Sequence, residues 1–159
     1  MNIFRLDTNA RRTAQFHCDK HVVKMILETA QMLSTAHRLA GNDNPILYRS
    51  THINHPCNIW VRESKWNYSW TYRLFYFLCA EYTHRYDKIH KTETKLRNVL
   101  LDYPSNIIHS DPTPFRPAIG RELTKGESPI IAYRDYYRSK KNTMKMVWTN
   151  REIPDWFNE

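Results

Sequence analysis

Asp19, His21 and Glu28 are the residues of this chain whose types and spacing best fit catalytic chemistry. They stand in the stretch HCDKHVVKMILETAQMLSTAHRLAG. Read at helical spacing, its polar side chains fall on one narrow stripe: His17, His21, Lys24, Glu28, Gln31, Thr35 and Arg38. A carboxylate held beside cations can stabilise a developing positive charge or move a proton. The stripe is therefore either the wall of an active site or the solvated edge of a helix on which Lys24 and Glu28 form an ordinary surface pair.

The helix that carries this stripe is otherwise apolar, which predicts that it lies in the core. The residues expected to face the core are Val22, Val23, Met25, Ile26, Leu27, Ala30, Met32, Leu33, Ala36 and Leu39. The chain has only three glycines, and its prolines cluster between Pro104 and Pro129, so long uninterrupted segments remain elsewhere. Helices are therefore expected at residues 7–40, with a break near His17, and at 56–86, 92–101 and 129–141.

These elements predict an all-α fold, with a single compact helical domain over residues 1–159 and long first and second helices. A Pro-rich loop at 104–127 is expected before the C-terminal helix, because prolines disrupt both regular elements. A tail at 143–159 should pack on the body of the protein through Trp148, Trp156 and Phe157. A chain of this length can bury such a core without covalent cross-links.

The charge and aromatic content point to nucleic acid as the partner. Lysine and arginine number 24 against 16 acidic residues, which gives a net charge of +8, and 13% of the residues are aromatic. The segment AYRDYYRSKK combines cations for phosphates with rings on which a base could stack. The candidate nucleic-acid-binding residues are His17, Lys20, Lys24, Arg38, His55, Arg62, Arg134, Tyr137 and Arg138.

Several other kinds of site are disfavoured by the sequence. His17 and His21 are spaced like a helical metal clamp, but no third ligand follows from the spacing, so no metal is expected. No glycine-rich phosphate loop occurs, and no cofactor is expected. Cys18, Cys57 and Cys79 are odd in number and are expected to be reduced packing residues. No apolar run is long enough to span a bilayer, so we expect no membrane partner and a cytoplasmic location in the host cell.

Longer motifs in the chain resemble a known enzyme family. Asp19, His21 and Glu28, then NHPCNIWVRESKWNYSWTYRLFYFLCAEYTHR, then AYRDYY near the C-terminus, resemble the phage pyrimidine-dimer DNA glycosylases of the endonuclease V type. The chain is also similar, over nearly its whole length, to small phage-encoded proteins with HCDKHVVKMILETAQ, NHPxNIWVR and a REIPDWF-type ending. The glycosylase resemblance implies a compact helical protein that flips a base out of duplex DNA.

The same resemblance implies a mechanism and a set of site residues. In the family an N-terminal amine attacks the sugar C1′, and β-elimination from the resulting Schiff base nicks the strand. By position, Glu28 would be the catalytic carboxylate, His21 a site residue on the same helix and His55 a loop residue near the DNA. Because Asn2 is expected to leave Met1 in place, Met1 would supply the amine.

Three functions remain open on the sequence. The first is a phage-type DNA base N-glycosylase, with an AP-lyase step, acting on a damaged or modified base in DNA. The second is a ribonuclease of the HEPN kind, because Arg85 and His90 have the spacing of its arginine and histidine motif. The third is a phage factor that binds nucleic acid or protein without chemistry.

Overall fold

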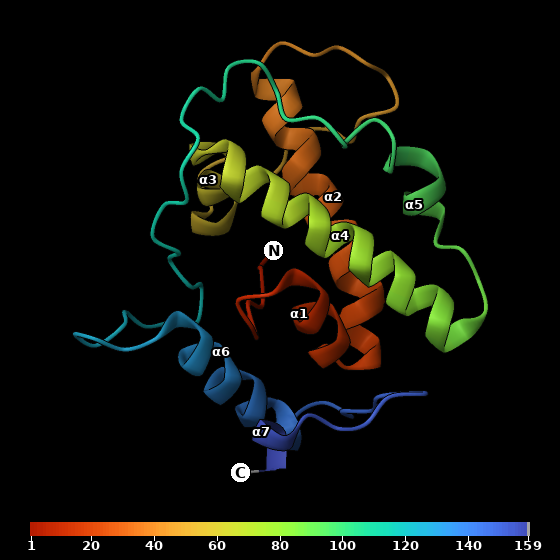
Figure 1. Ribbon diagram of the computed structural model, residues 1–159, viewed down its shortest axis with the longest axis vertical. Helices are drawn as coiled ribbons and strands as arrows, with labels where there is room; N and C mark the ends of the chain where they lie inside the picture. The colour runs from red at the N-terminus through yellow and green to blue at the C-terminus, as the bar shows by residue number, and fades with distance from the viewer. Residues whose placement is uncertain (159) are drawn as a thin grey trace.

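The computed structural model describes residues 1–158, which contain helices and no strand (Figure 1). The α-helices are α1 (Ala10–Phe16), α2 (Asp19–Leu39), α3 (Pro56–Glu63), α4 (Lys65–Tyr86), α5 (Lys91–Leu96), α6 (Pro129–Arg138) and α7 (Asp155–Asn158), and a short 3₁₀ helix, η1, spans Ser139–Asn142. The all-α prediction is therefore confirmed.

The two long helices, α2 and α4, form the centre of the molecule. They cross each other, α1 packs on α4, and α3 packs on both long helices (Figure 1). Tyr68 of α4 is fully buried at this crossing, where its hydroxyl lies 2.9 Å from His37 Nε2 and donates to the Leu100 carbonyl at 2.9 Å. Apolar side chains of α2, including Met25 and Ile26, are also fully buried.

The first predicted helix breaks where the sequence suggested. The Asn9 side chain accepts hydrogen bonds from Arg11 N and Arg12 N and so caps α1, and His17 has an extended backbone with ψ of 134°. The second predicted helix is also broken, at Ser64, which was not expected. Ser64 is extended, and its hydroxyl accepts from Asn67 N at 3.1 Å, so a new helix begins there.

The other two helices are shorter than predicted. Regular α5 ends at Leu96, with one further turn closed by a hydrogen bond from Leu100 N to Leu96 O. At α6 the α-helix gives way to η1 after Arg138. Local sequence patterns predict the last residue of a helix poorly, because terminal turns fray or tighten into 3₁₀ geometry. The C-terminal ends of α5 and α6 are both of this kind.

Not all of the apolar side chains of α2 face the core. Val23 and Leu27 are each 40% exposed and Leu39 is 44% exposed, which corrects the expectation that they would be buried. Val23 and Leu27 share the outer face of α2 with the exposed Lys20 and Lys24, at helical spacings of three and four residues. The hydrophobic character of these residues therefore did not indicate whether they lie on the buried or the solvent-exposed side of the helix.

The C-terminal segment is held against the helices by aromatic packing and by ion pairs. Trp148, Trp156 and Phe157 are buried, and Trp148 Nε1 donates to the Phe16 carbonyl at 2.9 Å. Arg151 pairs with Glu81 of α4 at 2.7 Å. Within residues 1–158 no helix is both long and apolar enough to cross a membrane.

Candidate active site

In the folded protein, Glu28 of α2 lies close to the N-terminus of the chain. The Met1 amine is 3.7 Å from Glu28 Oε1, and Asn2 N donates to Glu28 Oε2 at 2.9 Å. The Lys24 ammonium, one helical turn earlier, is 3.4 Å from Oε1. Glu28 is only 8% exposed, whereas the Lys24 side chain is 60% exposed, so lysine marks the side of the site that opens to solvent. The carboxylate therefore has a primary amine within reach and is shielded from most of the solvent.

The side chain of Asn2 fixes the position of this amine. Its Oδ1 accepts a 2.5 Å hydrogen bond from the Tyr133 hydroxyl of α6, and its Nδ2 donates to the Ala118 carbonyl at 3.0 Å. The same Tyr133 hydroxyl accepts from Ala118 N at 2.9 Å, which closes the network. Burial raises the pKa of Tyr133, so its hydroxyl stays protonated and can keep donating to Asn2.

His55 borders the site at the start of α3. Its Nδ1 accepts from Cys57 N at 3.2 Å, which caps the helix and leaves Nε2 to carry the ring proton. Burial lowers the pKa of His55, and the positive charges of the N-terminus and His52 lower it further, against an opposing contribution from Glu28. The imidazole beside the amine is therefore favoured in its neutral form.

His21 is also in its neutral form, for a similar reason. Burial, with the charges of Lys24 and Lys140, lowers its pKa to about 4. Its ring stacks on Phe4 with centroids 4.6 Å apart and meets Tyr137 edge-on at 5.0 Å. His21 is thus held as a neutral ring by aromatic packing against Phe4 and Tyr137.

Two predicted DNA-binding residues are enclosed in the protein, and these predictions were wrong. His17 is fully buried, its Nδ1 lies 2.7 Å from the Thr13 carbonyl, and burial lowers its pKa to about 3. Tyr137 is fully buried, and its hydroxyl accepts from Cys18 N at 2.7 Å. Both lie where α1, α2 and α6 meet, so neither can touch a nucleic acid in this conformation.

Four predicted DNA-binding arginines are engaged with the protein backbone. Arg38 donates to Leu47 O at 2.9 Å, and Arg62 donates to Ile53 O at the same distance. Arg134 donates to Leu6 O at 3.0 Å, and Arg138 donates to Trp156 O and pairs with Asp135. These guanidinium groups therefore hold loops and helix ends of the protein itself. Of the predicted binding residues, Lys20 and Lys24 are the ones on an exposed helix face beside Glu28.

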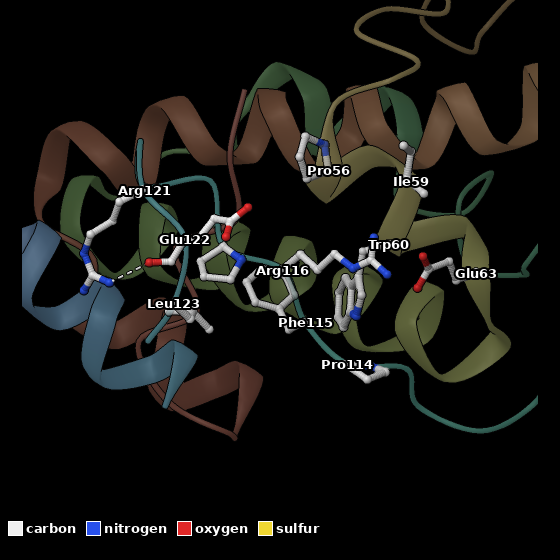
Figure 2. Close-up of a pocket in the computed structure, with 11 residues that line it drawn as sticks. Pro56, Ile59, Trp60, Glu63, Pro114, Phe115, Arg116, Arg121, Glu122 and Leu123 are labelled. Carbon is white, nitrogen blue, oxygen red and sulfur yellow. Dashed lines mark hydrogen bonds between the residues drawn. The ribbon is translucent and has the colours of Figure 1, made fainter. Parts of the chain in front are cut away.

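A cavity of about 460 Å³ lies between α3 and the Pro-rich loop (Figure 2). Its lining residues are Pro56, Ile59, Trp60, Glu63, Pro114, Phe115, Arg116, Pro117, Arg121, Glu122 and Leu123. The Trp60 and Phe115 rings meet edge-on at 4.7 Å, which joins the two walls. Pro56 follows His55 and Pro117 precedes Ala118, so both walls continue directly into residues that surround the N-terminus.

Sequence reasoning missed the cavity and the Asn2 network. Asn2 and Tyr133 are 131 positions apart, and no local pattern relates them. The only signal was that Tyr133 belongs to the AYRDYY motif, but the motif does not say which of its tyrosines faces the N-terminus.

The Arg85 and His90 pair does not form a ribonuclease site. The Arg85 side chain is fully buried and pairs with Asp19 at 3.0 Å and with Glu81 at 3.1 Å. His90 caps α5, with Nδ1 accepting from Thr92 N at 3.2 Å. Residues 1–158 also contain no cluster of three or more histidine, cysteine or acidic side chains that could hold a metal ion.

Comparison with known proteins gives one match. The family model for pyrimidine dimer DNA glycosylase matches residues 1–94, which is more than half of the chain. The matched part contains Met1, His21, Glu28 and His55, whereas the loop wall of the cavity and α6 lie beyond it. No curated protein and no solved structure matches the chain.

Proposed function

Because the chain belongs to the pyrimidine dimer DNA glycosylase family, we propose that it is a DNA N-glycosylase with AP-lyase activity that removes a damaged or modified base from DNA. The observation that carries this proposal is the 3.7 Å approach of the Met1 amine to the shielded carboxylate of Glu28. An amine and a carboxylate at this separation can divide nucleophilic attack and proton transfer between them.

In the proposed reaction, the Met1 amine gives up a proton to Glu28 and its nitrogen lone pair attacks the sugar C1′. The bond from C1′ to the base breaks, and the base leaves with the electron pair and takes up a proton. Glu28 then returns its proton to O4′ as the sugar ring opens, which yields a protonated imine between Met1 and C1′ and leaves Glu28 again as a carboxylate. Glu28 then accepts a proton from C2′, and the 3′ phosphate departs, which nicks the strand.

The surroundings of the amine suit this chemistry. Asn2, held by Tyr133 and Ala118, limits the movement of the nucleophile, and such positioning is a large part of what an enzyme contributes to a bond-forming step. We propose that neutral His55 and His21 complete the wall around the sugar, because neutral rings would not compete with the amine for Glu28.

We further propose that the neighbouring cavity receives a base that has left the helical stack. Enzymes that act on bases in duplex DNA extrude a nucleotide into a shaped pocket with aromatic or apolar walls. The volume of about 460 Å³ and the edge-on Trp60 and Phe115 rings support this role. Since Phe115 lies outside the matched residues 1–94, the choice of base would depend in part on a segment that the family model does not cover.

Borohydride trapping on duplexes that carry a pyrimidine dimer, an abasic site or a modified base tests the proposal. We expect a covalent adduct in which the peptide that ends in the α-amine is attached to DNA. Nα-acetylation, which converts that amine into an amide, should abolish trapping. If Met1 were removed, Asn2 N, which is 2.9 Å from Glu28, would be the new amine, and intact-mass analysis of the adduct distinguishes the two cases.

The Glu28→Gln variant should bind DNA normally while its rate of trapping falls by about two or more orders of magnitude, the scale of losing one positioned acid–base group. Glu93→Gln is a matched control. Glu93 also pairs with a cation one turn away, and its side chain is 13% exposed against 11% for Glu28. Salt-sensitive binding without an adduct on any substrate would refute the enzyme proposal and indicate a binding protein.

A further inference from the structure

The outer face of α2 carries an arrangement of side chains that the proposed reaction does not use. Lys20, Val23, Lys24 and Leu27 follow one another at spacings of three, one and three residues, so they lie on one side of the helix. Val23 and Leu27 are each 40% exposed, and the Lys24 side chain is 60% exposed. This face, which we call the α2 strip, therefore has two aliphatic side chains that alternate with two lysines along the helix.

The α2 strip is continuous with the proposed active site. Leu27 is the residue immediately before Glu28, and the Lys24 ammonium is 3.4 Å from Glu28 Oε1. A substrate whose sugar reaches Glu28 and the amine therefore lies beside Lys24, the member of the strip that pairs with Glu28.

The charge of the strip indicates what covers it. Protein–protein interfaces are depleted in lysine, whereas here two lysines alternate with the aliphatic side chains, on a chain with a net charge of +8. Lysines that flank a small apolar patch fit a polyanion that also offers apolar surface. Duplex DNA does so when its base pairs are unstacked.

We propose that Leu27, supported by Val23, enters the base stack beside the nucleotide under attack, while Lys20 and Lys24 contact the flanking phosphates. This inference rests on the proposed function, since it assigns a duplex to the same site. The Leu27 side chain would occupy the space left when a base is displaced and would slow the return of that base. Aliphatic wedges of this kind kink the duplex and hold it open in other DNA-bending proteins.

The test compares Leu27→Ala with Leu39→Ala. Both leucines are on α2 and are similarly exposed, at 40% and 44%, but Leu39 is at the far end of the helix from the amine. Alanine favours the helix, so both variants should fold. Substrates are a duplex with one abasic site and a single strand with the same abasic site, in which no paired base has to be displaced.

We expect Leu27→Ala to reduce trapping on the duplex by roughly tenfold to a hundredfold, the scale of losing one stacking contact, and to leave trapping on the single strand unchanged. Leu27→Met should restore the duplex rate. Equal duplex rates for Leu27→Ala and Leu39→Ala would overturn the inference, and so would an equal loss on both substrates.

A second measurement separates this inference from the proposed chemistry. The fluorescence of 2-aminopurine placed beside the abasic site rises when the base is unstacked, and it needs no reaction. One outcome is that the wild-type protein raises this fluorescence, the Leu27→Ala variant does not, and neither forms an adduct. In that case the inference about Leu27 stands and the glycosylase proposal fails. If adducts form normally but the fluorescence is the same for both proteins, the wedge is refuted and the glycosylase proposal stands.

Discussion

The Tyr133→Phe variant isolates the contribution of the Asn2 network to catalysis. The Tyr133 hydroxyl donates to Asn2 Oδ1 at 2.5 Å and accepts from Ala118 N at 2.9 Å. Its loss removes both hydrogen bonds without changing the volume of the ring, and Ala118 N loses its partner. We expect a loss of about 1–3 kcal/mol in the free energy of unfolding, the scale for leaving a shielded polar group unpaired.

The larger effect should be on the reaction rate. Without the Tyr133 hydroxyl, Asn2 keeps its hydrogen bonds to Glu28, Ile3 N and Ala118 O but loses its link to α6, so the amine can shift relative to Glu28. A displacement of about 1 Å can cost on the order of a hundredfold in rate when two groups must meet in one geometry. The measurements are single-turnover borohydride trapping, urea unfolding and DNA binding, and we expect binding to be unchanged.

Tyr68→Phe is the control for this experiment. Tyr68 is also fully buried, and its hydroxyl also has two partners, Leu100 O and His37 Nε2, both at 2.9 Å. It should lose a similar amount of stability and keep the wild-type trapping rate. If the two variants trap DNA equally well, the hydroxyl of Tyr133 does not position the amine and the reasoning is refuted.

Two further predictions concern pH and salt. The pKa of His17 is about 3 and that of His21 about 4, against about 6.5 for an unfolded histidine. The unfolded chain thus binds more protons as the pH falls below about 6.5. Each histidine should therefore lower the free energy of unfolding by up to about 1.4 kcal/mol per pH unit down to its folded pKa. Urea unfolding of wild type and His17→Gln between pH 7 and pH 4.5 measures this, and equal slopes would contradict it. DNA affinity should fall steeply with added salt, in a titration from low to physiological salt. The slope of this dependence reports how many counterions are released on binding, and the variant with both Lys20→Gln and Lys24→Gln should release about two fewer. An unchanged salt slope would place the DNA elsewhere on the protein.

The sequence predicts those parts of the fold that depend on short-range patterns. The narrow polar stripe contains Glu28, which lies beside the Met1 amine in the structure, because helical periodicity places polar side chains on a common face whatever the tertiary structure. The break at Ser64 could have been found in the same way, since serine is a favoured N-cap residue. Periodicity could not tell that Leu27 is outside and His17 inside, because burial depends on which neighbours cover each face.

The candidate site depended on contacts between distant segments, and these were beyond the sequence. The Asn2 hydrogen bonds reach Ala118 and Tyr133, which lie 116 and 131 positions away. An asparagine near a chain end and a tyrosine in a helix are both common, so their residue types do not indicate that they contact each other. The cavity wall was predicted only as a Pro-rich loop, because the prolines indicate irregular backbone but not the helix against which that backbone packs.

The span between Asn2 and Tyr133 also bears on the order of events during synthesis. Asn2 leaves the ribosome 131 residues before the α6 residue that anchors it. Domains fold as units once their partners are available, so we expect the amine to stay undocked and open to processing enzymes until α6 has been made. Whatever removes or modifies the first residue would therefore act before the protein can shield it. The chemical identity of the nucleophile would then be decided on the nascent chain.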